Sequence, residues 1–96
     1  EPVPGAESDL AADMVIEALG FEPEDLPAIF AAPDLALTDW RTIRTAGRTK
    51  ATTLEGVFAA GDIVRGASLV VWAVRDGQEA AAEIDAWLSD RQRAAA

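Results

Sequence analysis

The chain contains neither cysteine nor histidine among its 96 residues. Disulfide bonds, thiolate ligation of iron–sulfur clusters, a thiol nucleophile and an imidazole base are therefore excluded within it. The lack of cysteine neither indicates nor excludes an oxidising compartment.

Positive charge is scarce as well, with 8 Lys and Arg residues against 17 Asp and Glu and a net charge of −9. Nucleic-acid binding depends on Lys and Arg that neutralise phosphates, so DNA and RNA are not expected partners. No apolar run approaches the roughly 20 residues of a membrane helix. The acidic N-terminus also lacks the basic start of a signal peptide. We therefore expect no nucleic-acid partner and no membrane partner.

What the chain does contain is apolar residues, which make up 50% of it and suffice for one small globular domain. The first residue is Glu1 rather than Met. This start suggests that the chain is a piece of a longer protein.

The N-terminal third combines irregular and apolar stretches. Residues 1–5 are rich in Pro and Gly, and residues 1–11 are predicted to be irregular. Ala12 to Leu19 is apolar with a Val-Ile centre, which favours a buried strand ending at Gly20, although a helix is also compatible with its Ala, Met, Glu and Leu. The acidic connector over residues 21–27 is predicted to be a solvated surface rather than a metal site.

The middle of the chain predicts short elements. One helical turn is expected over residues 28–32, before Pro33. Residues 35–38 and 40–45 are rich in β-branched and aromatic side chains, which favours two short strands or one bent strand. Residues 46–51 are predicted to form a solvated loop.

A long helix is predicted after Ser68, which can act as its N-cap. Apolar and small residues recur at helical spacing along one face: Leu69, Ala73, Gly77, Ala80, Ile84 and Trp87 or Leu88. Gly77 costs about 1 kcal/mol relative to Ala in a helix interior, which predicts close approach of a neighbouring strand there. The charged residues Arg75, Asp76, Glu79, Glu83 and Asp90 are predicted to lie off this face. Residues 91–96 are predicted to fray.

The stretch from Thr52 to Asp62 has the most specific pattern in the chain. Val57 to Ala60 is an apolar run between Gly56 and Gly61, which predicts a buried strand with Asp62 at its carboxyl end. In α/β proteins this position, just before a helix N-terminus, often holds a ligand contact. If only the strand, the Gly and the Asp are considered, the simpler interpretation is that Asp62 accepts hydrogen bonds from nearby backbone N–H groups.

The whole string from Thr52 to Asp62 resembles the C-terminal flavin-binding motif of the FAD/NAD(P)-dependent pyridine nucleotide oxidoreductases. Gly61 to Gly77 is similar to the small (beta) subunits of NADPH-dependent glutamate synthase and their relatives. Ala12 to Pro23 resembles the strand by which that family returns from its NADPH domain to its FAD domain. Together these matches cover roughly residues 12–88 in the family's order.

The resemblance implies cofactor-binding roles at the matching positions. Asp62 would hold the ribityl chain of FAD, with Gly61 allowing close approach. The backbone at Ser68, Leu69 and Val70 would face the flavin ring, where a helix N-terminus stabilises negative charge. Gly20 would lie near the cofactor at a strand end, although its ordinary role of ending a strand is at least as well supported.

Other residues of this region have simpler interpretations. Arg65 and Gly66 could approach the nicotinamide of NADPH, but a solvated Arg on a loop is the favoured interpretation. Trp72 and Trp87 are expected to be core or interface aromatics. No residue is expected to be a catalytic acid, base or nucleophile, and no metal site is expected.

The resemblance also implies components that this sequence does not supply. No Gly-x-Gly-x-x-Gly loop is present to hold the phosphates of FAD or NADPH. Iron–sulfur clusters would lie elsewhere in the enzyme, because the chain has no cysteine. The expected partners are the remainder of the flavoprotein subunit and a large glutamate synthase subunit, in the cytoplasm. Self-association through apolar faces is a further expectation.

The predicted fold class is α/β, as part of the FAD domain of a two-dinucleotide-domain flavoprotein, with a few short strands and a long C-terminal helix. Residues 1–11 form the irregular segment, residues 12–90 the FAD-domain portion and residues 91–96 the frayed tail. The function implied is that of an NADPH-dependent oxidoreductase, with the 96-residue chain inactive by itself. The alternative is a free-standing, non-catalytic binding module of the same fold. An upstream Gly-x-Gly-x-x-Gly and clustered cysteines in the same reading frame would distinguish the two.

Overall fold

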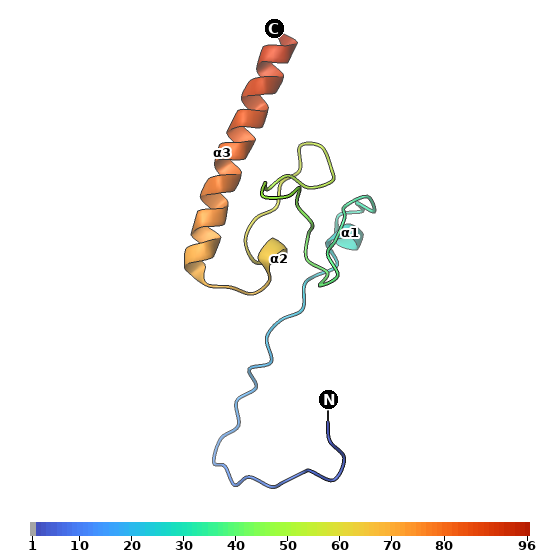
Figure 1. Ribbon diagram of the computed structural model, residues 1–96, viewed down its shortest axis with the longest axis vertical. Coiled ribbons are helices and arrows are strands. Elements are labelled where there is room, and N and C mark those ends of the chain that lie inside the picture. The colour runs from blue at the N-terminus through green and yellow to red at the C-terminus, as the bar shows by residue number, and fades with distance from the viewer. Residues whose placement is uncertain (1) are drawn as a thin grey trace.

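The computed structural model describes residues 2–96, and Glu1, the first residue of the predicted irregular segment, lies outside the described residues. The helices in chain order are α1 (Leu26–Ile29), α2 (Asp62–Arg65) and α3 (Val70–Ala95). Figure 1 shows an extended N-terminal segment, a group of loops around α1 and α2, and α3 running along one side of these loops. In the part of the chain that the structure describes, no helix combines the length and apolar character needed to cross a membrane.

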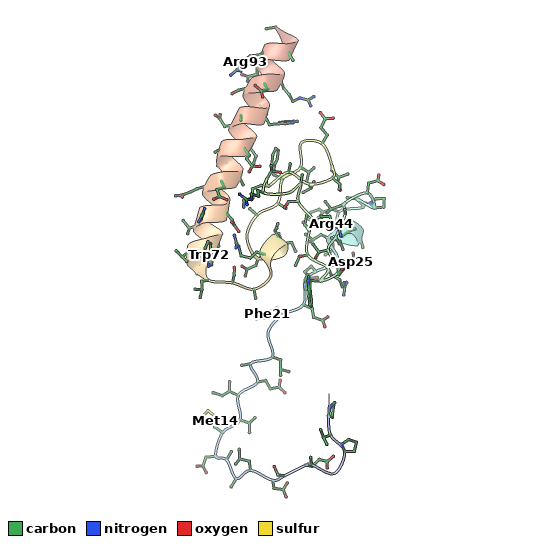
Figure 2. The ribbon with its side chains drawn as sticks, viewed as in Figure 1. Met14, Phe21, Asp25, Arg44, Trp72 and Arg93 are labelled. Atoms are coloured by element: carbon green, nitrogen blue, oxygen red, sulfur yellow. The ribbon has the colours of Figure 1, made fainter. Side chains whose placement is uncertain are left out.

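The N-terminal segment trails away from the rest of the molecule. Ala12 to Leu19, predicted as a strand, pairs with no other described segment, and its side chains are exposed. Figure 2 shows Met14 on this trailing segment, away from the folded part. The radius of gyration is 19.6 Å, against about 13 Å for a compact domain of 100 residues. The strand prediction fails here because a strand needs a hydrogen-bonding partner, and no described segment supplies one.

The first helical turn is set by a side-chain cap. Asp25 Oδ1 accepts a hydrogen bond from the Ala28 N–H at 3.4 Å, and Pro27 stands in the first turn, where its missing N–H costs nothing. The turn predicted over residues 28–32 is therefore present as α1, but it begins at Leu26. Among residues 2–96 no group of acidic side chains is arranged to hold a metal ion.

A tight hairpin replaces the two strands predicted over residues 35–45. Only Leu37 and Ile43 form an antiparallel bridge. The Arg41 N–H donates to the Thr38 carbonyl at 3.0 Å, and the Thr38 N–H donates to the Thr42 carbonyl at 2.8 Å. Arg41 has a φ of 63°, the left-handed position that normally takes Gly in a three-residue hairpin loop.

The buried strand predicted over Val57 to Ala60 is also reduced to one bridge, between Ala51 and Phe58. Ala59 is buried, but Val57 is partly open to solvent. A buried strand needs partners along both edges and cover on both faces. Residues 46–52 supply one edge only.

The core is small. It contains the buried side chains of Leu35, Ile43 and Ala59. Partly buried side chains pack around it: Leu26, Ala32, Leu37, Leu54, Ile63 and Val64. This core joins α1, the hairpin and α2, and it includes no residue of α3.

The long helix predicted near the C-terminus is confirmed, with different ends. It begins at Val70 with Leu69 as N-cap and no side-chain capping bond, so the N-cap prediction for Ser68 is wrong. It continues to Ala95, through the residues predicted to fray, since the Ala-rich tail favours helix. A Cβ on Gly77 would meet nothing within 4 Å, so no strand approaches there.

The face of α3 that contacts the rest of the chain shares Ala80 and Trp87 with the predicted face but is otherwise made of residues predicted to lie off it or to fray. Buried or interacting side chains recur at helical spacing: Asp76, Ala80, Glu83, Trp87 and Arg91. The chain bends closely around one of them, because a Cβ on Gly56 would lie 3.0 Å from Cη2 of Trp87. Helix α3 is therefore held by charged groups and one tryptophan, while much of its predicted apolar face is exposed.

Candidate functional site

Asp62 and Ser68 meet at the turn between α2 and α3. The Ser68 hydroxyl donates a hydrogen bond to Asp62 Oδ1 at 3.0 Å. Both side chains are exposed, and a carboxylate has about four acceptor positions, so Asp62 keeps the capacity to accept from hydroxyl groups of a ligand. Instead of capping α3, Ser68 orients the Asp62 carboxylate.

The N-terminus of α3 lies a few residues further along the chain. Its first N–H groups have no intrahelical acceptor, and no side chain caps them. Leu69, Val70 and Val71 expose their apolar side chains around this terminus. A helix N-terminus carries partial positive charge, so the site favours an anionic group or an electron-rich ring.

The two glycines expected near a ligand have different surroundings. Gly61 has a φ of 78° and a ψ of −150°, a conformation open essentially to Gly alone, and it precedes α2 as N-cap. Gly20 lies in the extended segment with a φ of 83°, and a Cβ added to it would meet nothing within 4 Å. Gly61 directly precedes Asp62, whereas Gly20 lies on the trailing segment, next to Phe21.

An open cavity of about 730 Å³ adjoins Asp62. Its walls come from the connector after Gly20, the hairpin tip and the α2 region: Phe21, Glu22, Pro23, Thr38, Trp40, Thr42, Asp62, Ile63, Val64, Arg65, Gly66 and Ala67. Phe21 and Trp40 are both strongly exposed. Two exposed aromatic residues in a cavity that Asp62 also lines are suited to a flat, partly polar ligand.

Arg65 is exposed, as the sequence favours, but it ends α2 and its guanidinium is paired. Its Nε donates to Asp76 Oδ2 at 2.9 Å and its Nη2 donates to Asp76 Oδ1 at 2.7 Å. The guanidinium also stacks over the Trp72 ring, 4.9 Å from the centroid. The Arg75 guanidinium lies 5.8 Å from the same centroid. Figure 2 shows Trp72 near the beginning of α3.

Asp76 is the most buried charged residue of the site region, with 2% of its surface exposed. The hydrogen bond from Arg65, followed by that from Lys50, holds the pKa of its carboxyl far below the ordinary value. Asp76 in turn raises the pKa of Arg65, and Glu79 and Asp76 raise the pKa of Lys50. The three charged groups are therefore ionised together at neutral pH.

Sequence reasoning missed Trp40 and Asp76 as residues of this region. The β propensity of Trp40 favours a strand, and nothing local indicates that it faces the segment around Phe21. Asp76 lies one position from the predicted apolar face, so helical spacing places it outward. The missed signal was a helical carboxylate without a neighbouring cation at i±3 or i±4, which leaves it free for distant ones.

The sequence of the chain is similar to those of known oxidoreductases. Residues 3–77 match the family described as pyridine nucleotide-disulphide oxidoreductase. The chain is 56% identical over 92 residues to the glutamate synthase [NADPH] small chain of Azospirillum brasilense, covering 96% of this chain and 19% of that protein. It is 60% identical over 84 residues to a putative glutamate synthase [NADPH] small chain of Cereibacter sphaeroides, covering 88% of this chain and 20% of that protein.

A relative with a different name is also similar in sequence. The chain is 44% identical over 94 residues to the NADP(+)-dependent formate dehydrogenase subunit beta of Moorella thermoacetica, covering 91% of this chain and 12% of that protein. In all three comparisons the chain spans a fifth or less of the relative's length.

Proposed function

The chain belongs to the pyridine nucleotide-disulphide oxidoreductase family, and on this premise we propose that it forms part of the FAD domain of an NADPH-dependent oxidoreductase similar to glutamate synthase small chains. Residues 12–90 would belong to that domain, with α/β architecture in the intact protein. The exposed stretch over residues 12–19 and the singly bridged stretch over residues 57–60 would then find strand partners in the remainder of the subunit. The identities of 56% and 60% favour glutamate synthase over the formate dehydrogenase relative at 44%.

The observation that carries the proposal is the hydrogen bond to Asp62 from Ser68, two residues before the start of α3, which no side chain caps. A carboxylate accepts hydrogen bonds from sugar-alcohol hydroxyls, and uncapped N–H groups favour negative charge. The residues present therefore fit the ribityl chain and the ring of a flavin. They do not provide for its phosphates, because the chain has no Gly-x-Gly-x-x-Gly loop.

Each site residue has a binding role in this proposal. Asp62 accepts hydrogen bonds from ribityl hydroxyls, and Ser68 fixes the orientation of its carboxylate. The N–H groups at Leu69 and Val70 face the ring, and Gly61 and Gly20 leave room for close approach. Bound FAD would supply the redox chemistry, taking electrons from NADPH for transfer to iron–sulfur clusters and a large partner subunit in the cytoplasm.

Asp62→Ala in the intact protein that carries this chain tests the proposal. Each charge-assisted hydrogen bond lost costs about 1.5–3 kcal/mol, so FAD should dissociate at least about tenfold more readily. Equilibrium dialysis with flavin absorbance measures this change. Asp39→Ala is the matched control, because Asp39 is exposed at the hairpin tip and does not line the cavity. Equal FAD affinity in the Asp62 variant and the wild type would overturn the assignment.

The 96-residue chain alone should bind FAD weakly or not at all, because half of a site still bears the full cost of ordering the ligand. Purification of this chain with stoichiometric flavin absorbance would contradict that expectation.

A further inference from the structure

We infer that Asp76 is a positioning residue: through Arg65 and Lys50 it fixes the turn that carries Asp62 against the first turns of α3. The effect of this positioning on ligand binding, through the alignment of Asp62 with the helix N-terminus, rests on the proposed function. Its structural part concerns only contacts within the described chain.

The link between Asp76 and Arg65 has defined geometry. Two hydrogen bonds, of 2.9 and 2.7 Å, join the guanidinium fork to both carboxylate oxygens. A two-point contact of this kind fixes direction as well as distance. The Trp72 ring lies 4.9 Å from the Arg65 guanidinium carbon and covers one face of it. Arg65 thus has one well-defined orientation relative to α3.

Lys50 attaches a second segment to the same carboxylate. Its Nζ lies 3.1 Å from Asp76 Oδ1 and 3.1 Å from Glu79 Oε2. The Lys50 backbone N–H also donates to Glu83 Oε2 at 2.7 Å. The loop over residues 46–51 is therefore attached to three successive turns of α3 by polar groups.

The placement of these contacts explains why Asp62 depends on them. Asp62 and Arg65 are the first and last residues of the single-turn helix α2, so holding Arg65 also holds Asp62. The connection from α2 to α3 begins at Gly66, which has a φ of 83°. Gly allows many backbone conformations, so this connection does not by itself set the relation between the two helices. The contacts of the buried Asp76 carboxylate with Arg65 set this relation.

The test uses Asp76→Asn in the intact protein, measured well below its unfolding temperature. Asn keeps the shape of Asp but removes the charge that pairs with both cations. Because misplacing Asp62 weakens its hydrogen bonds to the ligand, we expect FAD affinity to fall by up to about tenfold, no more than in Asp62→Ala. Asp85→Asn is the matched control, an exposed carboxylate on the same helix without an ion pair among the described residues.

A coupling measurement separates positioning from general destabilisation. Because Asp76 acts through Arg65 and Lys50, Asp76→Asn should have little further effect on FAD affinity in a background that carries both Arg65→Met and Lys50→Met. If Asp76→Asn lowers FAD affinity by the same factor in the wild type and in that background, the inference is wrong. Should Asp76→Asn fail to fold, Arg65→Lys provides the second variant, because it keeps the charge and loses the two-point contact. Unchanged FAD affinity in Arg65→Lys would count equally against the inference.

A readout on the 96-residue chain distinguishes this inference from the proposed function. In ¹H–¹⁵N spectra without FAD, the amide signals of Gly61 and Gly66 and the Nε signal of Arg65 should shift in Asp76→Asn and stay in place in Asp85→Asn. Unmoved signals in Asp76→Asn would overturn the positioning role. If the signals move but the intact wild-type protein binds no FAD, the proposed function fails and the positioning role stands.

Discussion

Asp76 accepts two hydrogen bonds from the Arg65 guanidinium while only 2% of its surface is exposed. The two residues are 11 positions apart and belong to different helices. A buried charge that lost its partners would be strongly unfavourable. The stability of the chain should therefore depend on the ionisation of this carboxylate.

Acid should destabilise the chain through Asp76. Its pKa is lowered in the folded state, chiefly by the Arg65 hydrogen bond. A depressed folded-state pKa gives stability that is fully present above the unfolded-state pKa of about 4 and is lost as the pH falls toward the folded-state value. Urea unfolding between pH 7 and pH 2 should show this loss, and Asp76→Asn should flatten the curve below about pH 4. The same acid slope in variant and wild type would exclude Asp76 as its source.

Gly56→Ala should destabilise the chain by about 1–3 kcal/mol. Gly56 has a φ of 76°, and a Cβ there would lie 3.0 Å from the Trp87 ring. Gly77→Ala is the contrasting variant, because Gly77 is helical and a Cβ would meet nothing within 4 Å. It should stabilise the chain by roughly 0.5–1 kcal/mol. Thermal unfolding followed by circular dichroism measures both, and a shift of the same sign in the two variants would refute the prediction.

Arg41→Gly should stabilise the hairpin. Arg41 has a left-handed φ of 63°, a conformation that costs an L-residue about 1–2 kcal/mol. Gly removes this strain, but it loses more conformational entropy on folding, which offsets part of the gain. We expect a net gain of about 0.5–1 kcal/mol in the free energy of unfolding. Arg44→Gly serves as control, because Arg44 has no positive φ and should lose stability. Loss of stability in Arg41→Gly would indicate that the Arg side chain makes a contact worth more than the strain.

The isolated chain should self-associate through its N-terminal segment. Exposed apolar side chains are concentrated there: Leu10, Met14, Val15, Ile16, Leu19 and Phe21. A continuous apolar surface of this kind promotes association. Sedimentation velocity should show a fraction of oligomers that rises with protein concentration. The double variant Ile16→Glu, Leu19→Glu should lower this fraction, whereas Glu17→Gln should leave it unchanged. A wild-type chain that stays monomeric at high concentration would contradict this.

The sequence predicted those features that depend on near neighbours. The spacing of apolar residues after Ser68 indicated α3, and the string ending at Asp62 located the turn that meets its N-terminus. Over residues 35–45 the composition predicted two short strands or one bent strand, whereas the structure has a hairpin with a single bridge.

Features that depend on distant residues were predicted poorly. Asp76 is buried only because Lys50 and Arg65, 26 and 11 positions away, supply its counter-charges. The glycine that a neighbour approaches is Gly56 rather than Gly77, and this follows from the distant Trp87. The predicted strands at residues 12–19 and 57–60 have strand-like composition, but pairing partners decide whether a strand forms.

The contacts that hold α3 also bear on the order of folding. At 26 residues the helix exceeds the length at which isolated helices become marginal. Its attachments span long loops, with 33 positions between Lys50 and Glu83 and 36 between Glu55 and Arg91. Closing such loops costs entropy before the contacts form. We therefore expect α3 to form early from local interactions, and its docking onto the loops to limit the rate at which this chain folds.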